Sequence, residues 1–370
     1  MKIVMVSMNS IHFRRWSEQL RDSKHEIHWF DVNGGPENKQ LDFVTQHVNW
    51  KYRLKKGHYF FKKVTSKLPF LKPIFERDIE KVFRKKIKEI QPDVVHSFAL
   101  YVSCTPILQV MKQSKIPWIY SSWGSDLFYF KEVPRYRRDI EAVLPEIDYL
   151  FTDCLRDQEL AKSLGFSGES LGVFPGGGGF PIEKLKQYHT PISDRKIILV
   201  KGYQGRSGRA IPVLKALKTL ESNLVNFEIV VFGCSPEVIE YKDENNLKGI
   251  FHKKLSHDEV LKLMGAALVY VGNSNSDGMP NTLLEAMCLG AFPIQSNPGG
   301  ATAEVITDGI NGYLISDCED VDEISDIIQR TISNLEMIAK SFEINQNLCK
   351  QWDRMEIQQK VMQSYSKISV

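Results

Sequence analysis

Two carboxylates stand around the predicted start of a helix in residues 274–290, "SNSDGMPNTLLEAMCLG". Asp277 comes directly before a Gly-x-Pro-Asn turn, and Glu285 follows about one helical turn later. The proline is a typical helix start and the final glycine a typical stop, so a helix is predicted between them. An apolar, strand-like run precedes the turn, so the helix would open at the carboxyl end of a parallel strand. Its unpaired N–H groups and positive dipole end would then favour a bound phosphate.

The two carboxylates add the contacts that a nucleotide sugar needs. Glu285 lies too far inside the helix to cap its free N–H groups, but its oxygens can accept hydrogen bonds from a ribose diol. Asp277, beside backbone amides, could hold hexose hydroxyls. The alternatives are an N-cap or turn role for Asp277 and a solvated position for Glu285. The predicted donor-binding residues of this stretch are Asp277, Gly278, Met279, Pro280, Asn281, Thr282, Leu284 and Glu285.

Strand-like apolar runs alternate with helical patterns along the whole chain, which indicates parallel βαβ units and an α/β fold. In the first half, the predicted strands span residues 2–8, 25–32, 93–98, 118–123 and 149–153, with helices such as 13–21 and 74–90. In the second half, the predicted strands span residues 196–203, 227–233, 249–254, 267–273, 290–296 and 312–316. Ligands of such sheets collect at the carboxyl ends of the strands, where the two carboxylates fall.

The chain of 370 residues exceeds what one hydrophobic core usually supports, which predicts two Rossmann-like domains. The run "PGGGGF" is too rich in glycine for regular structure and predicts a loop or hinge. No Gly-Lys-Ser/Thr follows it, so it is not a Walker loop. The predicted parts are an N-terminal domain at 1–172, a hinge at 173–195, a second domain at 196–345 and a C-terminal helix at 346–370.

Composition narrows the class of protein. The six cysteines are scattered without a Cys-x-x-Cys pair, which argues against a zinc site or a disulfide framework and favours buried thiols in a reducing compartment. The first residues have the pattern of a strand rather than of a cleavable signal. No apolar run reaches the roughly 18 residues of a membrane-spanning helix. We therefore expect a cytoplasmic protein.

Residues 51–88 are strongly basic and carry interleaved aromatic side chains. This composition suits docking on an anionic membrane surface, such as the inner face of the plasma membrane, where each basic residue adds about 1 kcal/mol. The alternative is a solvated helical face. The apolar side chains that favour docking, because they would otherwise be exposed without a reason, are Phe60, Phe61, Phe70 and Leu71.

Residues 274–290 resemble the E-x7-E region of the family 4 retaining glycosyltransferases of the GT-B fold, with Asp277 in place of the usual first Glu. The resemblance continues through "FPIQSNPGGATAEVITDGINGYLI", residues 292–315, and covers about the last half of the chain. It implies two Rossmann-like domains facing across a cleft, an acceptor-binding N-terminal domain, a nucleotide-sugar-binding C-terminal domain and a last helix that crosses back to the N-terminal domain.

The basic groups after the first strand of the second domain depart from the family pattern. The family usually has an Arg and a Lys there, which neutralise the donor diphosphate, but in "VKGYQGRSGRA" these places fall on Tyr203 and Gly208. We predict Arg206 and Arg209 as the catalytic clamp, because Arg suits bidentate phosphate binding, and Lys201 as a donor contact. The alternative is a mobile loop with solvated arginines. Asp277 is predicted to be catalytic as well as donor-binding.

In the N-terminal half, "YSSWGSDLFYF" looks like the family's His-Gly-x-Asp stretch, with Trp123 replacing the His. We predict Trp123 as an acceptor contact and Asp126 as a catalytic residue that contacts the acceptor or the donor sugar. A helix N-cap is the alternative for Asp126. His96 also ends a predicted strand, where a lone His is more often structural.

The loop after the first strand, "MNSIHFRRW", lacks the Gly-Gly pair of the family and places basic residues at a helix start. A basic helix start beside the cleft could receive an acceptor phosphate. Arg14 and Arg15 are otherwise ordinary surface residues. The predicted acceptor-binding residues of this loop are Ser10, His12 and Arg15.

The resemblance implies transfer of a hexose from a nucleotide sugar, UDP-linked, to a glycan or lipid-linked saccharide in polysaccharide biosynthesis. The departing diphosphate would be stabilised electrostatically and take the acceptor's proton on the same face. A metal should be unnecessary, because the Asp-x-Asp at Asp320 and Asp322 falls in an acidic helix start that the dipole explains. The competing hypothesis is a catalytically silent nucleotide-sugar-binding subunit. A dinucleotide oxidoreductase is disfavoured, since no Gly-x-Gly-x-x-Gly follows the first strand. No nucleic-acid partner is expected.

Overall fold

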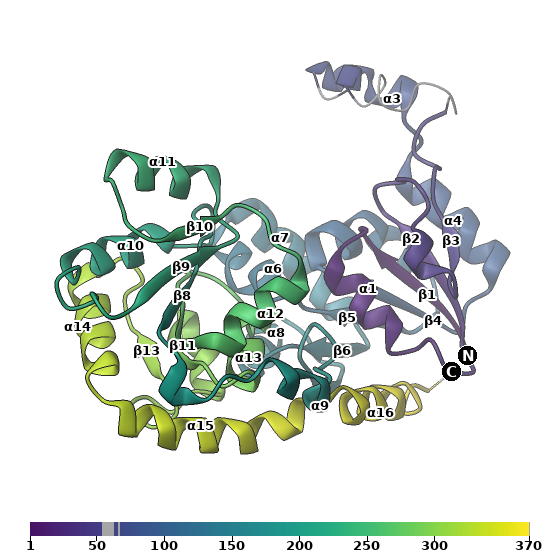
Figure 1. Cartoon of the computed structure of the whole chain (residues 1–370). Helices are drawn as coiled ribbons and strands as arrows, with labels where there is room; N and C mark the ends of the chain where they lie inside the picture. The colour runs from purple at the N-terminus through teal and green to yellow at the C-terminus, as the bar shows by residue number, and fades with distance from the viewer. Residues whose placement is uncertain (54–62, 66, 370) are drawn as a thin grey trace. The chain divides into compact units, whose positions relative to one another are not determined.

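The computed structural model describes residues 1–53, 63–65 and 67–369, which form two units (Figure 1). The first unit takes in Met1–Gly178 and the residues from Gln358 onward, and the second takes in Gly179–Ile357. Each unit is built on a parallel sheet with helices between successive strands. The predicted α/β fold with two Rossmann-like domains is therefore confirmed.

The first unit has a seven-stranded sheet in the order β3-β2-β1-β4-β5-β6-β7. Its strands are β1 (Lys2–Ser7), β2 (Glu26–Asp31), β3 (Thr45–His47), β4 (Val94–Phe98), β5 (Trp118–Ser121), β6 (Tyr149–Thr152) and β7 (Glu169–Val173). Its helices include α1 (Ile11–Glu18), α3 (Lys72–Phe75), α4 (Ile79–Ile90), α5 (Leu108–Met111), α6 (Ser125–Phe128), α7 (Pro134–Val143) and α8 (Leu155–Ser163).

The second unit has a six-stranded sheet in the order β10-β9-β8-β11-β12-β13. Its strands are β8 (Ile197–Lys201), β9 (Glu228–Phe232), β10 (Ile250–His252), β11 (Ala267–Gly272), β12 (Phe292–Ser296) and β13 (Tyr313–Ile315). Its helices include α9 (Ile182–Leu185), α10 (Ala210–Thr219), α11 (Pro236–Glu244), α12 (His257–Ala266), α13 (Asn281–Cys288), α14 (Val321–Ile332) and α15 (Leu335–Cys349).

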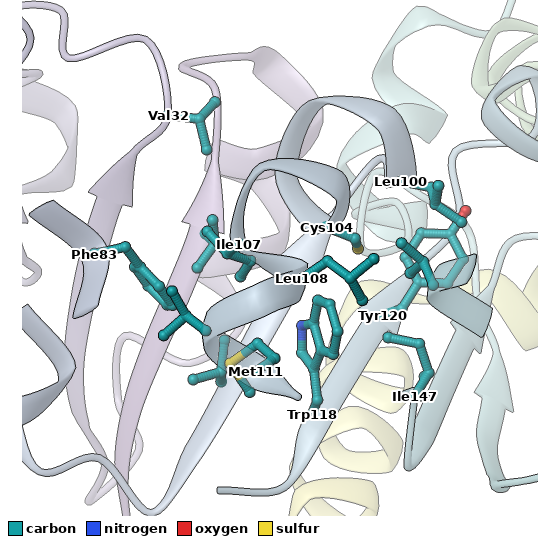
Figure 2. Close-up of a cluster of buried hydrophobic side chains, with 14 of the residues drawn as sticks. Val32, Phe83, Leu100, Cys104, Ile107, Leu108, Met111, Trp118, Tyr120 and Ile147 are labelled. Carbon is teal, nitrogen blue, oxygen red and sulfur yellow. The ribbon is translucent and has the colours of Figure 1, made fainter. Parts of the chain in front are cut away.

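The central strands are buried on both faces, as parallel sheets covered by helices require. Every residue of β4 and of β11 is buried, so alternate side chains pack against opposite layers. Figure 2 shows part of the core of the first unit, where Trp118 and Tyr120 of β5 pack with Ile107, Leu108 and Met111. The carboxyl ends of these buried strands therefore fix the loops that follow them.

The predicted helix at 74–90 is wrong in extent, because the chain is broken between α3 and α4. Tyr52 and Glu76 form an antiparallel bridge, which draws the segment into an extended conformation. Asp78 then caps α4, since its side chain accepts a hydrogen bond from the Lys81 N–H at 2.9 Å. The short edge strand β3 is absent from the predicted strands.

The division between the two units falls inside the glycine run, between Gly178 and Gly179. Both residues have positive φ, 73° and 75°. A Cβ on Gly178 would lie 2.9 Å from the Gln19 side chain, and one on Gly179 would lie 2.7 Å from the Trp352 carbonyl oxygen. Backbone conformation and close approach thus both demand glycine here.

The last helix, α16 (Arg354–Tyr365), is tied to the first unit through a buried polar cluster. The Tyr365 hydroxyl lies 3.2 Å from Trp16 Nε1 and 2.6 Å from His96 Nδ1, and His96 Nε2 lies 2.7 Å from Ser121 Oγ. The indole can only donate, so the hydroxyl donates its own proton to His96 Nδ1. Burial holds the pKa of His96 well below its usual value, so the ring is neutral with its proton on Nε2. His96 is therefore structural, as the sequence favours.

All six cysteines are free; five are buried and Cys318 is half-buried. Among the described residues, no helix combines the length and the apolar character needed to cross a bilayer.

Replacing Tyr365 with Phe should lower the free energy of unfolding by about 1–3 kcal/mol, because it leaves His96 Nδ1 and the Trp16 N–H buried without a partner. Chemical denaturation of the full chain measures this change. Tyr149→Phe is the matched control, since the Tyr149 hydroxyl accepts only an exposed bond from the Ser369 N–H. Equal effects of the two substitutions would contradict a special role for the buried cluster.

Candidate functional site

The start of α13 presents backbone N–H groups that no side chain caps. Pro280 occupies the N-cap position, one residue before the first helical residue, and it has no side-chain bond to the helix. Its carbonyl accepts the Leu283 and Leu284 N–H groups at 3.0 and 3.2 Å. The earlier amides, of Asn281 and Thr282, have no intrahelical acceptor, as at any helix start. The helix end thus offers donors and a positive dipole to an anion.

Glu285 lies inside α13 with only 4% of its surface exposed, so a solvated surface position is excluded. Its Oε1 lies 2.8 Å from Nε2 of His257, the first residue of α12. Thr282, one turn earlier, accepts a hydrogen bond from the buried Tyr270 hydroxyl at 3.0 Å. Burial raises the pKa of Tyr270, and the carboxylates of Asp277 and Glu285 raise it further. The two carboxylates of the sequence motif and a buried hydroxyl therefore surround the helix start.

Asp277 is half-buried in the loop between β11 and α13, and its Oδ1 accepts a hydrogen bond from the Gly278 N–H at 3.0 Å. Because Pro280 is the N-cap of α13, the N-cap alternative for Asp277 is wrong. Gly278, Met279 and Pro280 are buried. The hydrogen bond from the Gly278 N–H agrees with the alternative that Asp277 is a turn residue. Its contact with hexose hydroxyls stays a prediction.

The loop that carries the predicted basic clamp is paired with the loop that precedes α13. Residues 204 and 209 form one antiparallel bridge, and Gly208 forms another with Ser274. The Asn275 N–H also donates to the Ser207 carbonyl at 2.9 Å. A Cβ on Gly208 would lie 2.2 Å from the Tyr203 carbonyl oxygen, so only glycine fits where the family usually has a basic residue. The basic loop and the start of α13 are therefore one connected structure.

Arg209 is held inside this loop by several partners. Its Nη1 donates to the carbonyls of Gly205 and Gly208, both at 2.8 Å, and its Nε pairs with Glu319. Asn273 adds a second anchor, because its Nδ2 donates to the carbonyls of Arg209 and Cys318 at 2.9 and 2.8 Å. These contacts show that Arg209 stabilises the loop. The alternative prediction, a solvated arginine on a mobile loop, is therefore wrong for Arg209.

The remaining basic candidates are placed differently. Arg206 is exposed at the tip of the same loop, and Lys201 is half-buried at the carboxyl end of β8. Asp320, predicted to serve its helix rather than a metal, is the N-cap of α14 and accepts from the amides of Asp322 and Glu323, both at 2.9 Å.

Asp126 is buried in the first unit among internal donors. Its oxygens accept from the Leu100 and Trp123 N–H groups, both at 2.8 Å, and from the Tyr120 hydroxyl at 2.6 Å. It is not the N-cap of α6, which is Gly124, so that alternative is wrong. Burial raises its pKa. The carboxylate therefore ties together the loops that follow β4 and β5.

A second buried carboxylate adjoins Asp126 through a shared hydroxyl. Ser122 Oγ lies 3.4 Å from Asp126 Oδ1 and 3.0 Å from Asp157 Oδ2. Burial raises the pKa of Asp157 to about 6, opposed by the Arg156 guanidinium at 2.6 Å. Asp153 and Cys154 lie beside Asp157, with ligand-type atoms within 4.8 Å of one another. The ion pair already occupies Asp157, and burial raises the pKa of the Cys154 thiol, so the chemistry does not favour a metal there.

The predicted acceptor residues meet in part. The rings of His12 and Trp123 lie 5.6 Å apart between centroids, although they come from loops after different strands. Ser10 is the N-cap of α1 and accepts from the Phe13 N–H at 3.1 Å, a structural role that the sequence did not give it. Arg15 is half-buried.

Sequence reasoning missed His257 and a set of buried amides in the second unit. In the second unit, the amide side-chain oxygens that lie buried without a hydrogen-bond partner among the described residues belong to Asn273, Asn275, Asn281, Gln295 and Gln329. Only Asn281 carried a signal, because it is the first residue of the predicted helix. His257 follows the capping box of Ser256 and Glu259, which marks a helix start but no ligand.

Family models match nearly the whole chain. Residues 181–346 match the family described as glycosyl transferases group 1, and residues 2–153 match glycosyl transferase 4-like. A Bacillus subtilis (strain 168) protein assigned to teichuronic acid biosynthesis, the glycosyltransferase TuaC, is 24% identical over 274 residues, or 69% of this chain and 67% of that protein.

Solved structures share the fold at low sequence identity. Sucrose-phosphate synthase from Thermosynechococcus elongatus has a TM-score of 0.74 and 16% identity, over 99% of this chain and 98% of that one. Anabaena HepE in complex with UDP and glucose has a TM-score of 0.71 and 13% identity, over 100% of both chains. The family matches and the fold together define a GT-B glycosyltransferase. Within that class, the chain belongs to the group 1, family 4 glycosyltransferases.

Replacing Asn273 with Ala should loosen the basic loop, because the carbonyls of Arg209 and Cys318 lose their amide donor. We expect at least about tenfold faster amide hydrogen exchange in peptides covering residues 203–210, measured by mass spectrometry. Ser222→Ala, at an exposed position of the same unit, is the control. Exchange in that loop as slow as in the control would show that Asn273 does not hold it.

Proposed function

We propose that this chain is a retaining glycosyltransferase that moves a hexose from a UDP-sugar to a glycan or lipid-linked saccharide. The observation that carries the proposal is the burial of Glu285 inside α13, a helix whose start has no side-chain cap. HepE, which shares the fold, has been solved with UDP-glucose, and the Bacillus subtilis relative is assigned to teichuronic acid biosynthesis. Both support a UDP-sugar donor and a polysaccharide product.

The donor would lie along the start of α13. The amides of Asn281 and Thr282 would bind the pyrophosphate, where the helix dipole favours negative charge. Glu285 would accept hydrogen bonds from the ribose hydroxyls, and Asp277 would hold a hexose hydroxyl. The buried side-chain oxygen of Asn281 supports a ligand that brings a hydrogen-bond donor, such as a sugar hydroxyl, because a buried acceptor without a partner costs free energy.

The positive charge for the leaving group would come chiefly from Arg206 and Lys201. Arg206 is exposed at the loop tip, where a bound diphosphate could reach its guanidinium from solvent. Arg209 is already paired with Glu319, which leaves it less charge for a ligand, and its contribution would be to hold the loop and add a secondary attraction. The two arginines would thus act from one loop, with Arg206 contacting the diphosphate and Arg209 holding the loop in place.

The reaction would break the bond between the anomeric carbon and the diphosphate oxygen and form a bond to the acceptor oxygen on the same face. The acceptor's proton would pass to the departing diphosphate oxygen, which balances the charge. Because the new bond forms on the same face, the anomeric configuration would be retained. Stabilisation of the departing diphosphate by preorganised donors would be the main catalytic contribution. We propose that guanidinium groups and the helix end supply this charge without a metal. Asp126 would act as a positioning residue for the loop that carries Trp123.

A catalytically silent nucleotide-sugar-binding subunit is the second candidate. The pairing of Arg209 with Glu319 favours it, because a clamp already neutralised by an internal acid stabilises a leaving group less. Release of UDP distinguishes the two candidates: the enzyme hydrolyses a UDP-sugar slowly without acceptor, and the silent subunit binds UDP without turnover.

Glu285→Gln should weaken UDP binding by about tenfold to a hundredfold, because hydrogen bonds to a charged acceptor are worth about 1.5–3 kcal/mol. Calorimetry measures the affinity, and UDP release from UDP-glucose, UDP-galactose and UDP-N-acetylglucosamine measures turnover, which the substitution should abolish. Glu240→Gln, at an exposed position of α11, is the matched control. Wild-type protein without affinity for UDP, or a Glu285→Gln variant with unchanged affinity, would overturn the proposal.

We also propose that the basic segment predicted at residues 51–88 docks on an anionic membrane surface through its described residues 63–65 and 67–75. Within this segment, residues 52–53 and 75–76 are joined by the Tyr52–Glu76 bridge and by the Arg53 N–H, which donates to the Phe75 carbonyl at 3.0 Å. Its exposed apolar side chains are Leu68 at 44%, Phe70 at 72% and Ile74 at 62%, and its exposed basic residues include Lys63, Lys67 and Lys72. Phe60 and Phe61 lie outside the described residues. Apolar and cationic side chains on one short segment match an anionic bilayer surface.

The double substitution Phe70→Ser with Ile74→Ser should reduce binding to vesicles that contain phosphatidylglycerol by about tenfold or more, since burying such side chains is worth about 1.5–3 kcal/mol each. Co-sedimentation measures the bound fraction, with pure phosphatidylcholine vesicles as the reference. Val225→Ser, 77% exposed on the second unit, is the control. Wild-type protein that stays in the supernatant with anionic vesicles would refute docking.

A further inference from the structure

His257 contacts the carboxylate on which the proposed donor site depends. Its Nε2 lies 2.8 Å from Oε1 of Glu285, and the His257 side chain is 50% exposed while that of Glu285 is 5% exposed. The two residues are 28 positions apart, on the adjacent helices α12 and α13. A half-exposed ring on a buried carboxylate therefore forms the rim of this site.

The position of the ring is fixed by the start of its helix. His257 is the first residue of α12, directly after the N-cap Ser256, whose hydroxyl and backbone N–H are both engaged by Glu259. This capping box sets where α12 begins and so directs the first side chain. The imidazole approaches Glu285 from a rigid element rather than from a loop.

The direction of the hydrogen bond follows from the chemistry of the two groups. An ionised carboxylate only accepts, so Nε2 of His257 carries the proton that Glu285 Oε1 accepts. A carboxylate has about four acceptor directions, and the imidazole takes one of them. The hydrogen bond thereby restrains the plane of the carboxylate, since hydrogen bonds from outer partners orient carboxylates at binding sites. A fixed plane is what bidentate recognition of a vicinal diol needs.

We infer that His257 is a positioning residue, which holds Glu285 so that it accepts hydrogen bonds from both hydroxyls of a ribose and thereby makes the site select ribonucleotides over 2′-deoxyribonucleotides. This inference rests on the proposed function, because it deepens the role given to Glu285. A carboxylate that rotates freely could still accept a hydrogen bond from one hydroxyl. Holding it in the orientation that also accepts from the second hydroxyl would cost entropy. A carboxylate that is already oriented before binding therefore distinguishes ribose from 2′-deoxyribose.

The test compares the affinities of UDP and 2′-deoxy-UDP by calorimetry for the wild type and two variants. Wild-type protein should bind UDP about tenfold or more tightly than 2′-deoxy-UDP, the worth of a hydrogen bond to a charged acceptor. His257→Ala should reduce this preference to about threefold or less, with the affinity for 2′-deoxy-UDP changed less than about twofold. His257→Gln should restore the preference, because its amide N–H can donate from a similar distance.

His252→Ala, at the end of β10, is the control and should behave as wild type. A His257→Ala variant that keeps the full preference, or that loses affinity for both nucleotides equally, would overturn the positioning role. Failure of the wild type to bind UDP would instead overturn the proposed function itself, so the two failures are distinguishable.

Discussion

The burial of one carboxylate, Glu285, is the constraint on which the site of the second unit depends. A charged group withdrawn from water costs free energy unless hydrogen bonds or opposite charge compensate it. Here the fold supplies an imidazole at 2.8 Å and places the carboxylate in a helix that opens beside it. This burial occurs where β11 leads through a tight turn into α13.

In the first unit, the free-energy cost of a buried carboxylate is compensated by groups of the protein itself. Asp126 is equally buried, but backbone N–H groups and the Tyr120 hydroxyl surround it from within. Its effect is to join the loops after β4 and β5, and Ser122 extends this network to Asp157. The acceptor half of the proposed reaction would therefore rely on a rigid loop frame, which presents Trp123 and His12 together. Under the proposed function, the buried carboxylate of the second unit would contact the ligand, whereas Asp126 of the first unit joins two loops.

The sequence predicted the central strands and the helix after β11 because their signals are local: apolar runs, a proline start and a glycine stop. It missed β3, which lies at a sheet edge and carries polar residues. It extended a helix through residues 74–90 because the bridge from Tyr52 to Glu76 is a tertiary contact. For the same reason it foresaw neither the pairing of Arg209 with Glu319, 110 positions away, nor the ring that contacts Glu285. Such pairs depend on which loops the fold brings together.

A crystal structure of the protein with UDP bound tests the central claim most directly. The account predicts pyrophosphate oxygens within hydrogen-bond distance, about 2.7–3.2 Å, of the backbone amides at the start of α13, with both ribose hydroxyls on the carboxylate of Glu285. A pyrophosphate bound elsewhere, or a ribose that leaves Glu285 paired only with protein groups, would contradict it.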